Sequence, residues 1–75
     1  MKPCADCQRI IDAPTAPENA EPHAALRPLD GGRNIITTHG SAQNYLCEIC
    51  GTRFECLDKN YALPPQDAVE WTQIP

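Results

Sequence analysis

Two Cys-x-x-Cys pairs stand near opposite ends of the chain, Cys4 with Cys7 and Cys47 with Cys50. A Cys-x-x-Cys loop can turn both sulfur atoms toward one point, so two such loops supply the four soft thiolates of a tetrahedral metal site. Four thiolates leave no open position for water or substrate, which is typical of a structural site rather than a catalytic one. The spacing therefore predicts one tetrahedral metal ion, and four thiolates suit zinc or a single iron.

The size of the chain indicates why such a site would be needed. Only 41% of its 75 residues are hydrophobic. A core of that size rarely supplies more than roughly 3–5 kcal/mol, so a disulfide set or a metal is expected to stabilise the fold. No apolar stretch follows Met1, so we see no secretory signal, and no run approaches the ~18 apolar residues of a membrane span. We therefore expect a cytoplasmic protein, where thiols stay reduced, and an odd number of cysteines also favours a metal over disulfides.

The second cysteine pair is expected on a turn of a small β-sheet. The β-branched segment 33–39 and the segment 43–46 predict two strands, and the alternation over 52–57 predicts a third strand that leaves the metal loop. Prolines make 13–29 a long loop, because proline breaks helices and removes hydrogen-bond donors from strands. In the tail, 66–71 follows two prolines, and we expect one or two turns of helix there at most.

The paired loops and the hairpin resemble a zinc ribbon, a family in which one cysteine pair lies on an N-terminal loop and the other on a turn between strands. The likeness is greatest over 45–52, which reads Tyr-Leu-Cys-Glu-Ile-Cys-Gly-Thr. It is looser at the first pair, which Gln8 follows where a glycine is common. The 39 residues between Cys7 and Cys47 also exceed the roughly 15–20 of the compact spacing. The loop at 13–29 accounts for the excess, since doubling a loop costs only ~0.6 kcal/mol.

This resemblance implies a small metal-stapled β-rich domain with two or three antiparallel strands and a long N-terminal loop. We expect the zinc ribbon to occupy 1–60 and a C-terminal tail to occupy 61–75. Rubredoxins, small acidic proteins that hold one iron between two such loops, are a second resemblance and imply an electron carrier. They have a glycine after both pairs and an aromatic-rich core, whereas this chain lacks the first glycine and is 5% aromatic. Zinc is therefore favoured over iron.

Four further residues could act as ligands or contacts. Cys56 is expected to be a buried thiol outside the metal site, because strand alternation places it beside Phe54. His23 and His39 are expected to be surface or turn residues, since four cysteines already complete a tetrahedron. Trp71 is expected either to anchor the tail on the small core or to stand exposed as a contact for a partner.

The charge balance indicates the kind of partner. Ten carboxylates against six Lys and Arg give a net charge of −4 without a basic run, which disfavours binding driven by phosphate neutralisation. No phosphate-binding loop or catalytic triad is visible, so we expect no enzyme. We expect a structural-zinc module that binds a protein as an adaptor or regulator, with contacts at Trp71, Arg33 and Arg53. The zinc-ribbon resemblance implies transcription or other nucleic-acid machinery. The remaining alternative is a nucleic-acid-binding ribbon that uses Arg33, Arg53 and Lys59.

Overall fold

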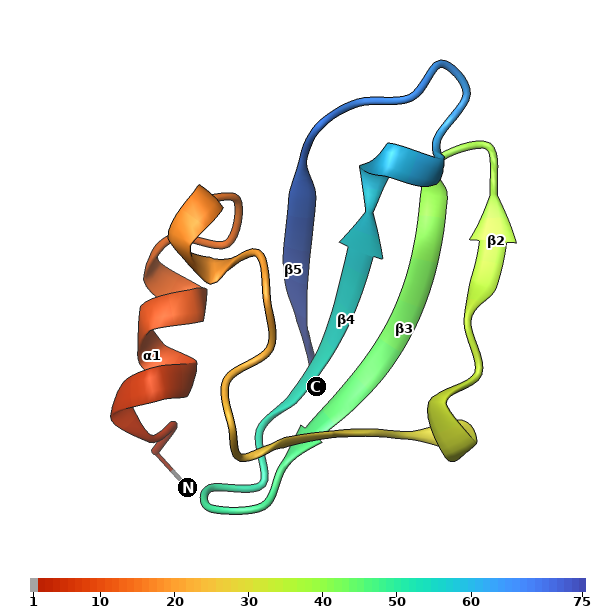
Figure 1. The fold of residues 1–75 in the computed structure, drawn as a ribbon. Helices are drawn as coiled ribbons and strands as arrows, with labels where there is room; N and C mark the ends of the chain where they lie inside the picture. The colour runs from red at the N-terminus through yellow and green to blue at the C-terminus, as the bar shows by residue number, and fades with distance from the viewer. Residues whose placement is uncertain (1) are drawn as a thin grey trace.

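A computed structural model describes residues 2–75, which form a five-stranded antiparallel sheet with one α-helix beside it (Figure 1). The strands lie in the order β1-β3-β4-β5, and β2 also pairs with β3. The helix α1 spans Ala5–Asp12, and the strands are β1 (Leu26–Pro28), β2 (Ile35–Thr37), β3 (Gly40–Cys47), β4 (Arg53–Asp58) and β5 (Val69–Ile74). Single 3-10 turns occupy Pro17–Asn19, Asp30–Gly32 and Lys59–Tyr61.

Strand β3 is the centre of the sheet, and it carries one of the predicted ligands at its end. Its first three residues pair with β2, its last three pair with β1, and residues 41–46 pair with β4. Leu26 of β1 lies opposite Cys47, the last residue of β3. The turn from β3 to β4 therefore lies at the end of the sheet where β1 crosses, and Figure 1 places the N-terminal end of α1 at this same end.

The hydrophobic core gathers the cysteines together with aromatic side chains. Trp71 of β5 is 3% exposed, and its ring meets Phe54 edge-on with centroids 5.8 Å apart. The centroid of the Tyr45 ring lies 5.5 Å from that of Trp71, with the two rings tilted by 52°. The indole Nε1–H donates to the carbonyl oxygen of Asn19 at 2.6 Å, which joins the tail to the N-terminal segment. The buried core cluster consists of Cys7, Ile10, Leu26, Cys47, Cys50, Phe54 and Trp71.

Three expectations about the fold are wrong. The sheet has five strands rather than two or three, because 26–28 and 69–74 also pair in it. The segment 66–71 is not helical, and β5 begins within it at Val69. Alternating apolar residues there pack on the core and satisfy their backbone groups on β4, which outweighs the weak helical signal after two prolines. The helix lies instead at the N-terminus, where a loop was expected.

The three central strand predictions are confirmed with shifted ends. The segment 33–39 contains the shorter β2, 43–46 lies inside β3, and 52–57 overlaps β4. The predicted loop at 13–29 is irregular for most of its length, but it contains one 3-10 turn and all of β1.

Candidate metal centre

The first cysteine pair is positioned by the start of α1. Cys4 is the residue before the helix, and Cys7 lies in its first turn, where it is fully buried. Cys7 and Ile10 are three residues apart and therefore lie on one face of the helix, which packs into the core. This amphipathic spacing explains why a helix forms at the cysteine pair and which way its sulfur atoms face.

The second pair is positioned by the turn between β3 and β4. Cys47 ends β3 and Cys50 lies in the turn, and both are buried. The Gly51 N–H donates to the Cys47 carbonyl at 2.9 Å, and the Cys47 N–H donates to the Thr52 carbonyl at 2.9 Å. Gly51 has a φ of +77°, a conformation that glycine adopts without strain, so the turn can close tightly around its two sulfur atoms.

The four cysteines form one cluster, as the spacing predicted. The Sγ atoms of Cys4 and Cys47 are 3.8 Å apart, and those of Cys7 and Cys50 are 3.6 Å apart. Two thiolates on one tetrahedral zinc, each bonded at about 2.3 Å, lie about 3.8 Å from each other. Both distances join one loop to the other, so the cluster is compatible with a metal site that ties the helix to the sheet.

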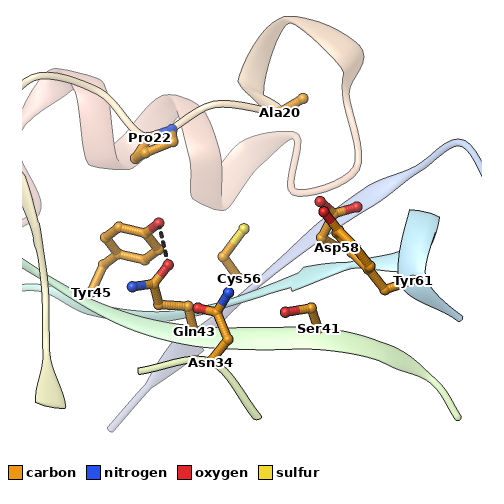
Figure 2. Close-up of a pocket in the computed structure, with 9 residues that line it drawn as sticks. All are labelled: Ala20, Pro22, Asn34, Ser41, Gln43, Tyr45, Cys56, Asp58 and Tyr61. Atoms are coloured by element: carbon orange, nitrogen blue, oxygen red, sulfur yellow. Dashed lines mark hydrogen bonds between the residues drawn. The ribbon is translucent and has the colours of Figure 1, made fainter. Parts of the chain in front are cut away.

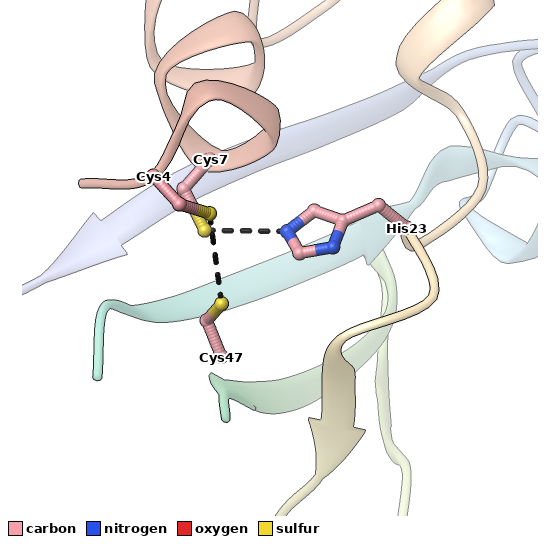
Figure 3. Close-up of side chains that lie close together, drawn as sticks. All are labelled: Cys4, Cys7, His23 and Cys47. Atoms are coloured by element: carbon pink, nitrogen blue, oxygen red, sulfur yellow. Dashed lines mark hydrogen bonds between the residues drawn. The ribbon is translucent and has the colours of Figure 1, made fainter. Parts of the chain in front are cut away.

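The cluster also contains a histidine that the sequence reasoning placed elsewhere. His23 Nε2 lies 3.2 Å from Cys7 Sγ, and Figure 3 shows the ring pointing from its loop into the sulfur atoms. The ligand atoms of Cys4, Cys7, His23 and Cys47 all lie within 4.8 Å of one another. The expectation of an ordinary surface or turn residue is therefore wrong for His23. His39 is exposed, as expected, with its backbone N–H bonded to the Thr37 hydroxyl.

The acidities of the thiols show why the cluster suits a cation. Burial raises the pKa of the Cys7 thiol well above its usual range, and the side chains of Cys47, Cys4 and Cys50 raise it further. Burial also acts to raise the pKa of Cys50, but hydrogen bonds from the Thr52 hydroxyl and from backbone groups lower it to about 5. Ionising Cys7 among the other sulfur atoms is therefore costly, and a bound divalent ion would offset that cost because its charge is the largest in the site.

Cys56 lies outside the cluster and is half-buried against the core. Burial and the nearby Asp58 raise the pKa of its thiol to about 11, so it is protonated near neutral pH. It lines a polar cavity of about 260 Å³ between the sheet and the segment that carries Ala20 and Pro22 (Figure 2). The other lining residues are Ala20, Pro22, Asn34, Ser41, Gln43, Tyr45, Asp58 and Tyr61.

The residues predicted to contact a partner differ in their exposure. Trp71 is buried, so it anchors the tail, and the alternative of an exposed contact for a partner is wrong. Arg33 and Arg53 are exposed, and Arg53 donates a hydrogen bond to the Pro75 carbonyl at 2.9 Å. Lys59 lies 3.7 Å from the carboxylate of Glu70.

Comparisons of the chain with known protein families, with curated proteins and with solved structures find no match. No helix in the described residues is long and apolar enough to span a membrane.

Proposed function

We propose that this chain is a structural zinc module in which Cys4, Cys7, Cys47 and Cys50 hold one zinc ion. One observation carries the proposal: three of the thiols that would bind the metal, Cys7, Cys47 and Cys50, belong to the buried hydrophobic core cluster, and Cys4 packs against it. A metal at this position joins α1 to the β3–β4 turn and adds a cross-link to a hydrophobic core that is small. Four thiolates complete the coordination of zinc, so the proposed role is structural and not catalytic.

Metal content tests this proposal directly. Protein purified without added metal should be colourless and contain one zinc per chain, because tetrahedral thiolates bind zinc without visible absorption. Iron bound by four thiolates is coloured, so a red protein with one iron per chain would instead support the rubredoxin-like electron carrier. Metal measured at far less than one ion per chain in a folded protein would refute both.

We further propose that the module works in a reducing compartment such as the cytoplasm, as an adaptor or regulator that contacts a protein. The net charge of −4 favours a basic protein surface over a phosphate backbone. Ile35 and Ile36 are 64% and 69% exposed on β2, and successive strand residues point to opposite faces. Together they offer apolar contacts on an outer strand, which is a common way to bind a protein segment.

The arrangement of basic residues supports a protein over a nucleic-acid partner. Arg53 begins β4 and Lys59 follows its last residue, so about 20 Å of strand separates them. Arg53 and Lys59 are therefore too far apart to form one basic patch, and Lys59 already faces Glu70. The association with transcription or other nucleic-acid machinery rests on the zinc-ribbon resemblance alone.

A capture experiment and a binding experiment distinguish the partners. Zinc-loaded protein should retain a protein from a cell extract, and the variant Ile36→Lys should lose it while keeping its zinc. RNA or DNA binding that weakens steeply between 50 and 200 mM salt would overturn the preference, because such a slope reports displaced counterions.

A further inference from the structure

His23 is held by two contacts that together indicate the tautomer of its ring. Its Nδ1 accepts the backbone N–H of Ala25 at 3.2 Å, and its Nε2 faces Cys7 Sγ at 3.2 Å (Figure 3). A backbone N–H can only donate, so Nδ1 must present its lone pair to Ala25. A neutral imidazole carries one hydrogen, which then lies on Nε2 and points at the sulfur.

This tautomer cannot bind a metal through Nε2, because that nitrogen has no free lone pair. The distance agrees. A nitrogen and a sulfur on the same tetrahedral zinc lie about 3.5–3.6 Å apart, when their bonds to zinc are about 2.05 and 2.3 Å. The observed 3.2 Å between Nε2 and Cys7 Sγ is shorter and fits an N–H···S hydrogen bond. Cys50 Sγ, at 3.6 Å from Cys7 Sγ, is the better fourth ligand.

We propose that His23 is a positioning residue, which donates its Nε2–H to the metal-bound thiolate of Cys7 and so fastens the 20–28 segment to the metal centre. The inference rests on the proposed zinc site and adds to it a contact from outside the ligand set. A thiolate that accepts this bond carries less negative charge, which lowers the cost of gathering four thiolates around a divalent ion.

The hydrogen bonds around His23 show what this fastening would hold. The Leu26 N–H donates to the His23 carbonyl at 3.0 Å, and Leu26 begins β1. The Ala25 carbonyl accepts the N–H of Glu48 in the second cysteine loop, also at 3.0 Å. The 20–28 segment therefore contacts both cysteine loops, through His23 at the first and Ala25 at the second.

The same segment forms one wall of the polar cavity. Ala20 and Pro22 line the cavity opposite Tyr45 and Cys56 of the sheet, as Figure 2 shows. Because Pro22 precedes His23 directly, the bond from His23 to Cys7 holds this wall in place. The proposed bond would join this wall of the cavity to the metal centre through one side chain.

Chelator competition with zinc tests the proposal on the full chain. We expect His23→Ala to bind zinc roughly 10–100-fold more weakly, the usual effect of losing a hydrogen bond to a metal ligand. His23→Gln keeps an N–H near the position of Nε2 and should recover most of that loss. His39→Ala, a change at the exposed histidine, should bind zinc as the unchanged chain does. Equal affinity of His23→Ala and the unchanged chain would overturn the proposal.

Two further measurements separate a hydrogen-bond donor from a ligand. If His23 were a ligand, His23→Gln would lose as much zinc affinity as His23→Ala. The unchanged chain with cobalt in place of zinc would then show the absorption of a site with three thiolates and one nitrogen, and both variants would lose that spectrum. We expect a four-thiolate spectrum in both variants. In the unchanged zinc protein, ¹⁵N NMR should find the His23 hydrogen on Nε2, and an unprotonated Nε2 would refute the assignment even if the variants fail to fold. If the unchanged chain binds no zinc, the proposed function itself fails.

Discussion

Replacing Trp71 should remove a large share of the protein's stability, because this side chain joins the tail, the sheet and the N-terminal segment. It is 3% exposed and packs on Phe54 and Tyr45. Truncating a buried tryptophan to alanine typically costs 3–5 kcal/mol, through lost burial and the cavity that remains. Domains of ordinary stability have about 5–15 kcal/mol in total, so Trp71→Ala removes a large share.

Trp71→Phe isolates the hydrogen bond from most of the packing. In the unchanged chain the Trp71 Nε1–H donates to the Asn19 carbonyl at 2.6 Å. Phenylalanine keeps an aromatic ring but leaves that carbonyl without a donor. An unpaired buried acceptor costs about 1–3 kcal/mol, and the smaller ring adds to that loss. We therefore expect the unchanged chain to be the most stable, Trp71→Phe to be intermediate and Trp71→Ala to be the least stable, with differences of a few kcal/mol between them.

Urea unfolding of the zinc-loaded proteins, followed by far-UV circular dichroism, measures these differences without relying on tryptophan fluorescence. Tyr61→Ala is the matched control, since this aromatic ring is 61% exposed and its loss should change stability by no more than about 0.5 kcal/mol. If Trp71→Phe were as stable as the unchanged chain, the tail would not pack as described, and the reasoning from β5 would be refuted.

The remaining predictions concern the ligands and one backbone contact. Cys47→Ser should abolish tight zinc binding and the folded state together, whereas Cys56→Ser should retain zinc. Release of zinc by Cys56→Ser would show that the ligand assignment is wrong. Gly40→Ala should destabilise the zinc-loaded protein by about 3 kcal/mol or more, because φ is +137° and a Cβ would lie 2.5 Å from a backbone oxygen of β4. Gly31→Ala is the control, because its φ of +67° is also strained for alanine but the space around it is open, so we expect a loss of only about 1 kcal/mol. Equal losses of stability for the two variants in urea titrations would argue against the close approach of position 40 to β4.

The cysteine cluster was predictable because its signal is local. Each Cys-x-x-Cys pair specifies its own loop. Two such loops complete one four-thiolate metal site only when they come together. The strands 33–39, 43–46 and 52–57 were also predictable, since β-branched residues and alternation mark them within a few residues. Their ends shifted because pairing with a neighbouring strand, and not propensity, decides where a strand stops.

The helix and the last strand carried signals that could have been used. Cys7, Ile10 and Ile11 have helical spacing, which the reading of the first cysteine pair as a loop obscured. In the tail, Val69 and Trp71 alternate with polar residues in a way typical of a strand. This alternation is a stronger signal than the two prolines before it, which only permit a helix to start.

His23 and β1 were less predictable, because tertiary contacts place them. Nothing near His23 in the sequence shows that its loop folds back onto Cys7, 16 residues away. β1 is three residues long and ends in a proline, so its pairing with β3 depends on the chain being brought there. The one available signal was a histidine lying between two cysteine pairs, which is a residue type common around zinc.

The central claim is that a metal at the four cysteines completes the core. Titrating zinc into the metal-free protein under reducing conditions, followed by far-UV circular dichroism, tests it most directly. The account predicts a largely unfolded metal-free chain that gains its sheet signal linearly and stops changing at one zinc per chain. A metal-free chain with the full sheet signal, unchanged by zinc, would contradict it.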